Sequence, residues 1–568
     1  MSFDASYAPP PAGSGLPGSG LRRPARAGAA SRPGVLPGRR PRARILRLML
    51  LSGTIVAGLA GVLSATAHAA PDDQIRARLE ALEKRLAEQD RLIDQQQAQI
   101  RDLKTRSAAG FSEAKRLVEE QPKLSVANAR PTFTSADGNF AVSLRGRFHY
   151  DLAQYAQDLD RTATPRAATG GDAAEAARAL DLNSGGNFRR AQIGIEGTVL
   201  KDWAFNITYE VGGSGQEDGG RITETWLGYN GIAPFRFQIG AFPPPANLDD
   251  ATSSNDTAFI ERATPAELGR SLAGGDGRYA LGARAAGEAW QGSLFLTGAL
   301  VNTPRDGGAA FPAVNSDEQA ALVGRGSTVL SKSQDHLLHI GASATWVFSP
   351  GQTADPSAPV GAIRSPVRLR DRPELRVDGT RFIDTGNINA GAATALGAEM
   401  AGHWKSFHAQ GEFFRYTIDR KTVTGPALPD ADFTGWYAQA GWVLTGEAKR
   451  YNAQSGAYGN PRPDKPFNLS TGDLGAWEVA ARYSLADLND RADDPLAAAR
   501  IRGGRQEVVT LGLNWYPNSN VRFLLNYLFV DIDRRNPGGF TGPLAVTAPN
   551  GEIGQSFQAI ALRTQLTF

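Results

Sequence analysis

The sequence predicts an all-β fold, a transmembrane antiparallel β-barrel of roughly 16 strands, preceded by a short N-terminal α-helical coiled coil. Three observations support this fold. Apolar and polar residues alternate in the last segment, the same alternation recurs from about residue 132, and short and long connections alternate between the strands. In residues 556–568 large apolar side chains share one parity: Ile560, Leu562, Leu566 and Phe568. A period of two describes a strand with one apolar face. Because chain ends usually fray in soluble domains, a strand that reaches the last residue is expected where it closes a barrel.

The composition agrees with a barrel and excludes other classes. Hydrophobic residues make up 41% of the 568, too few for a helical membrane protein but suited to strands with one face toward water. Cysteine is absent, which excludes disulfides and thiol chemistry. Residues 1–50 hold nine of the 61 basic residues and one of the 58 acids, which leaves the rest with a net charge of −5. We therefore expect no nucleic-acid partner.

The basic leader has the three parts of a secretory signal peptide, which we assign to residues 39–69. Arginines form its positive part, an apolar run covers 45–63, and Ala67-His68-Ala69 is an A-x-A cleavage site. The alternative is a transmembrane anchor, but Gly, Ser and Thr dilute the run. Residues 1–38 are rich in Pro, Gly and Ala, and they are either disordered or an over-extended start.

A heptad pattern follows in residues 71–106. Apolar residues recur at every seventh position, at Leu79, Leu86, Ile93 and Ile100, and Gln89 and Gln96 occupy two of the alternate core positions. This spacing predicts a coiled coil in which the polar core positions set the register. Because so short a coiled coil needs partners, we expect an oligomer; a single solvated helix is the alternative. Residues 107–131 are predicted to be a linker.

From residue 132 the period becomes two, and the barrel is predicted to cover residues 132–568. In the first strand Phe140, Val142 and Leu144 alternate with Ser143 and Arg145. Further strands are predicted at 190–196, 203–211, 235–242, 278–285, 291–300, 336–347, 396–404, 407–418, 436–445, 476–485, 508–516 and 521–531. At roughly 25–28 residues per strand and loop, the segment holds roughly 16 strands.

The connections between these strands alternate in length. Short ones such as Lys405-Ser406 are polar, and long ones are expected at 158–185, 303–333, 349–389, 447–473 and 533–555. Short turns at one end and long loops at the other describe an outer-membrane barrel with periplasmic turns and external loops. We therefore expect the outer membrane of a Gram-negative bacterium, with lipid around the barrel and the coiled coil in the periplasm.

Several runs resemble the phosphate-selective porin O and P family. The clearest are FRRAQIGIEGTVLKDWAFNITYE (188–210), LGYNGIAPFRFQIGAF (227–242), SSNDTAFIER (253–262), GWYAQAGWVLTGE (435–447), GAWEVAARYS (475–484) and TLGLNWYPNSNVRFLLNY (510–527). The resemblance covers about residue 130 to the end. It implies a homotrimer of barrels, an outer-membrane porin whose water-filled channel passes anions by diffusion, with phosphate or polyphosphate as the expected partner and no cofactor.

An anion channel needs fixed positive charge on its inner face, and the polar faces of the predicted strands supply it. Arg145, Arg147 and Arg190 lie on these faces, and Arg189 has the opposite parity at a strand end. Guanidinium groups stay charged and present bidentate donors to phosphate. In the family, the first-strand arginine and the FRR pair line the anion path, which implies this role for Arg147, Arg189 and Arg190. The alternative is that some of these arginines pair with acids of the channel, such as Asp151.

Further basic residues fit the same reading. Arg370 and Arg372 match an arginine ladder that the family carries in an R-x-R-P stretch; the alternative is a solvated external loop. Arg462 and Lys465 resemble a later basic patch of the family. Arg563, on the polar face of the last strand, is a further candidate for the channel wall.

The chain departs from the phosphate-selective pattern in the loop that narrows the channel. Ser253 and Ser254 match the serine motif, but Asp249 and Asp250 stand where phosphate-selective members carry lysine, and Ala204 replaces another basic position. An acid pair near a constriction repels anions. The alternative function is therefore a general porin without phosphate selectivity.

Two other function classes fit the sequence less well. His336 and His339 lie three apart on a predicted strand and face opposite ways, so they cannot form a metal pair. The sequence contains neither a G-x-S-x-G motif nor a Walker loop. We therefore expect neither an enzyme nor a metal site. A barrel-anchored structural tether, with the coiled coil as its working part, is the remaining alternative.

Overall fold

The computed structural model describes the residues to which all structural statements refer: 72–119, 121–127, 129–157, 182–212, 220–274, 279–287, 292–301, 319–351, 365–422, 425–535 and 554–568. The predicted extension 1–38 and signal peptide 39–69 lie outside them, as do most of the loops expected at 158–185 and 533–555. No helix in the described ranges combines the length and the apolar character that crossing a membrane requires. The chain divides into two compact units, Met1–Ala109 and Gly110–Phe568.

The described part of the first unit is helical. Helix α2 covers Asp72–Glu119 and starts with two acids, whose negative charge favours a helix N-terminus. Its heptad residues are about half exposed, with Leu79 at 53% and Leu86 at 58%. The helix predicted for residues 71–106 is confirmed, and its association with helices of other chains in a coiled coil stays a prediction. Residues 107–119, predicted as a linker, continue the helix. The heptad pattern stops before this segment, but the segment is still rich in the good helix formers Ala, Glu and Lys.

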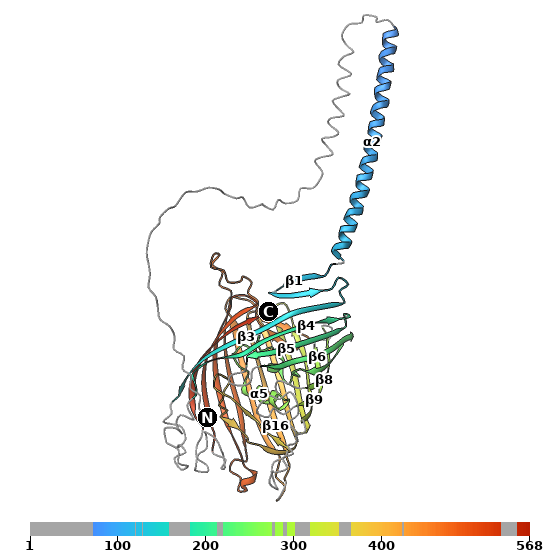
Figure 1. The fold of residues 1–568 in the computed structure, drawn as a ribbon. Helices are drawn as coiled ribbons and strands as arrows, with labels where there is room; N and C mark the ends of the chain where they lie inside the picture. Colours follow the sequence, from blue (N-terminus) through green and yellow to red (C-terminus); the bar gives the residue numbers. More distant parts are fainter. Residues whose placement is uncertain are drawn as a thin grey trace, which may run out of the picture. The chain divides into compact units, whose positions relative to one another are not determined.

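The second unit is dominated by one antiparallel sheet of 19 strands (Figure 1). It begins with the short strands β1 (Lys123–Ala127) and β2 (Arg130–Thr134). The long strands are β3 (Phe140–Gln157), β4 (Gly185–Val199), β5 (Trp203–Gly212), β6 (Arg221–Ile232), β7 (Phe235–Ala241), β8 (Tyr279–Gly287), β9 (Gly292–Val301), β10 (Gln319–Lys332), β11 (His336–Ser349), β15 (Ile388–Trp404), β16 (Phe407–Arg420), β17 (Ala431–Val443), β20 (Ala476–Asp490), β21 (Ile501–Tyr516), β22 (Val521–Asp533) and β23 (Ser556–Thr567).

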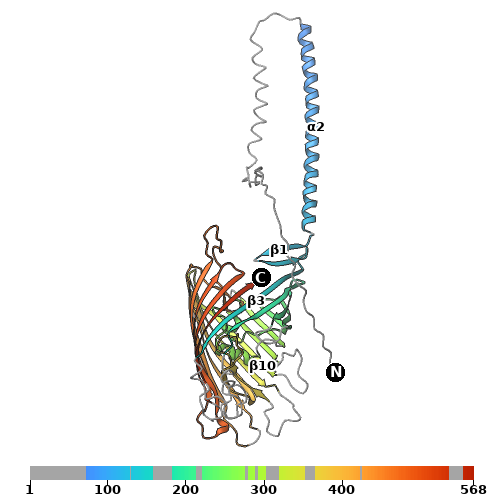
Figure 2. The same cartoon turned by 60° about the vertical axis from the view of Figure 1, so that its left-hand side comes forward.

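Each long strand pairs with the next long strand along the chain, from β3 to β23. Strand β23 then pairs with β3, and Figure 2 shows β3 beside the red final strand. Taking away β1, β2 and β12 (Pro366–Val367) leaves sixteen strands within the described residues, the number that the sequence predicts. The predicted large antiparallel β structure is thus confirmed.

The alternation in the sequence places side chains on the two faces of the sheet as predicted. In β22 Arg522 and Asn526 are buried and Leu525 is exposed; in β23 Arg563 is buried and Leu562 is exposed. Figure 1 shows helix α5 (Thr264–Leu272) within the curve of the strands. The buried face, which carries the polar residues, is therefore the inner face of the sheet.

Strand β10 lies within residues 303–333, which the sequence predicts to be a long loop. Its residues are mostly Ala, Gly, Ser and Val, and Val323 shares the buried face with Arg325 while Leu322 is exposed. The contrast between a polar and an apolar face is lost, so the alternation could not reveal this strand. Strand β6 was likewise not among the predicted strands.

The connection between β17 and β20, residues 444–475, corrects a second expectation. It leaves the sheet at the end that carries the short turns 200–202, 333–335 and 405–406. The sequence predicts residues 447–473 to be one of the long loops at the opposite end, and this prediction is wrong. Its hairpin of β18 (Arg450–Asn452) and β19 (Ala457–Gly459) buries Ala457 and Tyr458 against Leu248. A long connection fits at this end because it packs inside the sheet. We call it the turn-side connection.

Two connections from the opposite end also fold against the inner face. The inner loop, residues 242–274, carries α4 (Leu248–Ala251) and α5. The second inner segment, residues 365–387, carries β12, β13 (Arg370–Asp371) and β14 (Ile383–Asp384). Phe259, Leu268 and Phe382 of these segments are almost fully buried. The hydrophobic core of the unit therefore lies inside the curve of the sheet, between its wall and the inserted segments.

Candidate functional site

Side chains of the sheet fix the inner loop by binding its backbone. Glu412 of β16 accepts hydrogen bonds from the backbone N–H groups of Leu248 (2.7 Å) and Asp249 (3.0 Å). A carboxylate in this place satisfies donors that the start of helix α4 leaves unpaired. Asn526 of β22 accepts a hydrogen bond from the N–H of Ile260 at 2.8 Å. The loop is thus held against strands far apart in the sequence.

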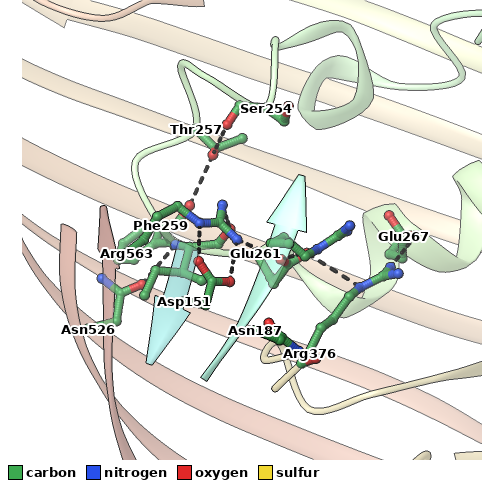
Figure 3. Close-up of polar contacts among 12 residues, drawn as sticks. Asp151, Asn187, Ser254, Thr257, Phe259, Glu261, Glu267, Arg376, Asn526 and Arg563 are labelled. Atoms are coloured by element: carbon green, nitrogen blue, oxygen red, sulfur yellow. Dashed lines mark hydrogen bonds and ion pairs between the residues drawn. The ribbon is translucent and has the colours of Figure 1, made fainter. Parts of the chain in front are cut away.

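Three arginines converge on the carboxylate of Glu261 in the inner loop, and Figure 3 labels two of them, Arg376 and Arg563. Arg189 Nε lies 2.7 Å and Arg563 Nη2 lies 3.0 Å from Glu261 Oε1, and Arg376 Nε lies 3.4 Å from Oε2. Burial alone would raise the pKa of Glu261, but the guanidinium groups of Arg189, Arg376 and Arg563 together hold that pKa well below its ordinary range. Glu261 therefore stays ionised and joins two strands and the second inner segment to the inner loop.

Arg189 and Arg190 both lie on the inner face, although neighbours on a strand normally alternate. The pairing of β3 with β4 shifts its register so that His149 lies opposite Arg190 and Tyr150 opposite Phe188. Arg189 is the extra residue of a β-bulge, which turns two successive side chains to one face. Arg189 is paired with Glu261, whereas Arg190, 8% exposed, forms no ion pair with a described residue.

Arg145 and Arg147 on β3 differ in the same way. Arg145 Nη1 lies 3.2 Å from a carboxylate oxygen of Glu196 and 3.9 Å from one of Glu224, so its charge is largely balanced. Arg147 has no carboxylate at ion-pair distance in the described ranges, and its Nη1 donates to Ser254 Oγ at 3.2 Å. Two residues that the sequence predicted separately for the site are therefore in contact.

Asp249 and Asp250 face the interior of the inner loop, which corrects the expectation that they repel anions. The carboxylate of Asp249, 3% exposed, accepts the backbone N–H of Ala263 at 3.2 Å, and burial raises the pKa of Asp249. Asp250 pairs with Arg270 of α5 at 2.8 Å. Because α4 packs toward α5, both acids are used in holding the loop together.

The predicted arginines of the second inner segment lie inside the sheet, where a solvated external loop was the alternative. Arg370 belongs to β13, and Arg372, directly after it, is buried. The neighbouring Glu374 accepts the backbone N–H of Thr264 at 2.9 Å and pairs with Arg482 of β20. The alternative is therefore wrong: this segment packs against the inner loop.

Three cavities beside the inner loop share lining residues. The first, of about 290 Å³, is lined by Arg145 and Arg147 among others; the second, of about 1140 Å³, by Ser253 and the turn-side connection; the third measures about 170 Å³. Asn255 lines the first and third cavities, and Asp256 lines the second and third. The three cavities therefore adjoin at the tip of the inner loop.

Sequence reasoning missed several residues that build this region. Arg482 and Arg522 are 3% and 2% exposed, and each has the inner parity of its strand, so the alternation could have identified them. Glu261 lies in the SSNDTAFIER run, where no strand pattern marks it. Arg563 has the predicted inner position, but it is paired with Asp151 and does not form an open channel wall.

The later basic patch divides between two environments. Arg462 lines the third cavity, whereas Lys465 is exposed and lies 3.8 Å from Asp473. The turn-side connection therefore presents one of its two predicted cations to the cavity system.

Comparisons with known proteins identify the chain's relatives. An uncharacterized protein of Caulobacter vibrioides is 28% identical over 418 residues, 72% of this chain and 71% of the relative. Porin O of Pseudomonas aeruginosa is 25% identical over 414 residues, 70% of this chain and 85% of the relative. Among solved structures, an anion-selective porin of Comamonas acidovorans superposes with a TM-score of 0.42 at 11% identity, covering 76% of this chain and all of that one. The family description "Phosphate-selective porin O and P" matches residues 168–568, and the chain therefore belongs to this porin family.

Proposed function

We propose that the chain forms a transmembrane β-barrel in the outer membrane, with a water-filled channel through which anions diffuse. The observation that carries this proposal is that Arg147 and Arg190 lie on the inner face without a carboxylate partner among the described residues. Arg145, Arg189 and Arg563, by contrast, are paired with acids. Arg147 and Arg190 therefore set a positive potential beside the inner loop, and such a potential favours anions over cations.

The exposed face of the sheet supports a lipid environment. Aromatic rings stack on it beside the short turns: Trp404 lies 6.4 Å from Phe407, and Phe407 lies 5.1 Å from Trp442. Trp477 and Trp515 stack at 5.5 Å beside another turn. Aromatic girdles of this kind lie at the interfaces of outer-membrane barrels. We infer that lipid covers the apolar face above them.

The oligomer that we propose is a homotrimer. The apolar heptad residues of α2 are about half exposed in a single chain, as at Ile93 (49%) and Ile100 (52%), and packing against two copies would cover them. The coiled coil would lie in the periplasm, because α2 precedes the sheet on the chain and follows the proposed signal peptide. Substituting Leu79 and Leu86 by Glu together tests this part: the trimer should dissociate at lower temperature in detergent while the folded barrel persists. An unchanged dissociation temperature would refute a role of α2 in the trimer.

The experiment for the main proposal is the reversal potential of the purified protein in a planar bilayer with a salt gradient. We expect anion preference, reduced by Arg147→Gln and further by the double variant with Arg190→Gln. Arg415→Gln is the matched control, because Arg415 is 59% exposed and lies away from the inner face. Cation preference of the wild-type channel would refute the proposal, and absence of any conductance would favour a structural tether.

Phosphate or polyphosphate is the anion that we propose, which rests on the family and on the contact between Arg147 and Ser254. Both side chains donate hydrogen bonds, and a tetrahedral oxyanion can accept from both. Added phosphate should therefore reduce the chloride current. If chloride current is unaffected while anion preference remains, the channel is a general anion porin.

A further inference from the structure

Arg522 of β22 is a buried cation that the proposed anion path does not use. Its Nη1 donates to three oxygens: the carbonyl oxygens of Asn255 (3.2 Å) and Thr257 (2.8 Å) and the side-chain oxygen of Asn460 (3.2 Å). The residue is 2% exposed and has no ion-pair partner among the described residues. One nitrogen of the guanidinium group therefore holds the inner loop and the turn-side connection, and this uses only part of its donors.

The other edge of the same guanidinium group has no hydrogen-bond partner among the described residues, and the group lies over the ring of Tyr516, 4.8 Å from its centroid. Nε and Nη2 of Arg522 are buried and form no hydrogen bond in the described part of the chain. Buried donors normally find an acceptor, because leaving them unpaired costs the free energy of their desolvation. The Nε–Nη2 edge is the one that binds two oxygens of a carboxylate or phosphate in parallel. The unpaired edge thus has the geometry of a bidentate oxyanion site.

A cavity with further positive charge adjoins this residue. Arg522 lines the third cavity, of about 170 Å³, together with Arg450, Arg462 and Asn460. The pKa of Arg450 is lowered mainly by burial and next by the positive charge of Arg462, which shows that the two guanidinium groups lie near each other. Asp256 is the carboxylate that lines this cavity, and its side chain accepts the backbone N–H of Asn460 at 3.2 Å. Three guanidinium groups against one carboxylate leave the cavity with excess positive charge.

We propose that this cavity is a second anion-binding site, which takes one tetrahedral oxyanion such as phosphate, with Arg522 as the bidentate ligand and Arg462 and Arg450 as additional cations. It lies on the side of the inner loop where the turn-side connection enters, and it adjoins the first cavity through Asn255. An anion that passes Arg147 would therefore find this site next, at the tip of the same loop. The inference deepens the proposed function, on which it rests.

The test is isothermal titration calorimetry of the full-length protein in detergent with inorganic phosphate. Arg522→Lys keeps the charge and one donor toward the loop but loses the bidentate edge, so affinity at this site should fall about 5- to 10-fold. Arg505→Lys is the matched control, because Arg505 is 46% exposed and pairs with Glu507 at 2.7 Å. Heat-modifiable gel migration and unitary conductance report whether each variant is folded.

A second variant keeps the test valid if Arg522→Lys disturbs the inner loop. Arg462 is exposed and lines the cavity, so Arg462→Gln should weaken phosphate binding about 3-fold, and heat-modifiable gel migration should be the same as that of the wild type. Lys465→Gln, in the same connection but not lining the cavity, should leave binding unchanged. Binding that is equal to wild type in both Arg522→Lys and Arg462→Gln would overturn the proposal.

The two proposals fail in distinguishable ways. Loss of the site at Arg522 would leave the reversal potential anion-selective, because Arg147 and Arg190 are unchanged. A cation-selective wild-type channel would refute the anion porin whatever the calorimetry shows. Two phosphate binding events, one weakened by Arg147→Gln and the other by Arg522→Lys, are the expected result.

Discussion

Arg563 of the last strand and Asp151 of the first long strand form a bidentate ion pair, with both N–O distances at 2.7 Å. The two residues lie directly opposite each other in the pairing of β23 with β3, and their side chains are 1% and 0% exposed. Arg563 also donates to the carbonyl oxygen of Ile260 and pairs with Glu261. One guanidinium group thus joins both strands and the inner loop.

Breaking this pair should destabilise the folded protein strongly. Asp151→Asn leaves a buried arginine with one acid in place of two, and removing one partner of a buried pair costs about 3–5 kcal/mol. The measurement is the urea midpoint of the protein refolded in lipid, read by heat-modifiable migration. Asp531→Asn is the control, because Asp531 is on the exposed face of β22 and should shift the midpoint little. Equal midpoints for the two variants would contradict the role of the pair.

The neighbours Arg189 and Arg190 should give different phenotypes. Arg190→Gln removes an uncompensated charge, so it should lower anion preference without changing the noise of the open channel. Arg189→Gln removes a ligand of Glu261, so the inner loop should become less firmly held and current fluctuations should rise. Single-channel recording separates the two readouts. Identical selectivity changes in the two variants would contradict the assignment of Arg189 to loop anchoring.

Acid substitutions in the inner loop should follow their orientation in the structure. Asp250→Asn should leave the reversal potential unchanged, because Asp250 pairs with Arg270 inside the loop. Asp256→Asn should increase anion preference, because Asp256 lines the second and third cavities. A large selectivity change in Asp250→Asn would show that this carboxylate does face the ions.

The second inner segment should loosen as the pH rises through neutrality. Burial, and next the nearby Glu267, raise the pKa of Asp371 from 3.8 to about 7. The protonated form is favoured by the folded state, so its stabilisation is complete below about pH 4 and is lost as the pH rises through about 7. Hydrogen exchange in residues 365–387 should therefore be faster at pH 8.5 than at pH 5.5, after correction for the intrinsic rate. Asp371→Asn should abolish this pH dependence, and a variant that kept it would exclude Asp371 as its source.

The sequence predicts most of the sheet because alternation is a local property. Strands such as β22 and β23, with Arg522 or Arg563 on one face and Leu525 or Leu562 on the other, are visible in isolation. Strand β10 is not, because Val323 shares the inner face with Arg325 and removes the contrast. The end at which residues 444–475 leave the sheet is inferred in the sequence from the length of the connection, and length misleads here because the connection packs inside the sheet, where Ala457 and Tyr458 are buried against Leu248.

The candidate site is less predictable because its charges are decided by long-range pairs. The parity of β3 and β4 indicates which arginines face inward, but whether each remains a free charge depends on the path of the inner loop. Arg189 and Glu261 are 72 residues apart, and Arg563 and Asp151 are 412 apart. No local pattern shows that Glu261 neutralises Arg189 while its neighbour Arg190 stays unpaired. The β-bulge that makes both face inward is equally invisible in the sequence.

The contacts of Arg563 also constrain the order of events during biogenesis. Its side chain completes the binding of Ile260 and Glu261, yet it belongs to β23, which follows the other described strands along the chain. Insertion of the inner loop and arrival of the C-terminus are therefore parts of one step. A chain truncated before β23 would hold Asp151 without this cation and the inner loop without one of its anchors. Such a chain would not form a narrower version of the same channel, because the inner loop inside the sheet would be less firmly held.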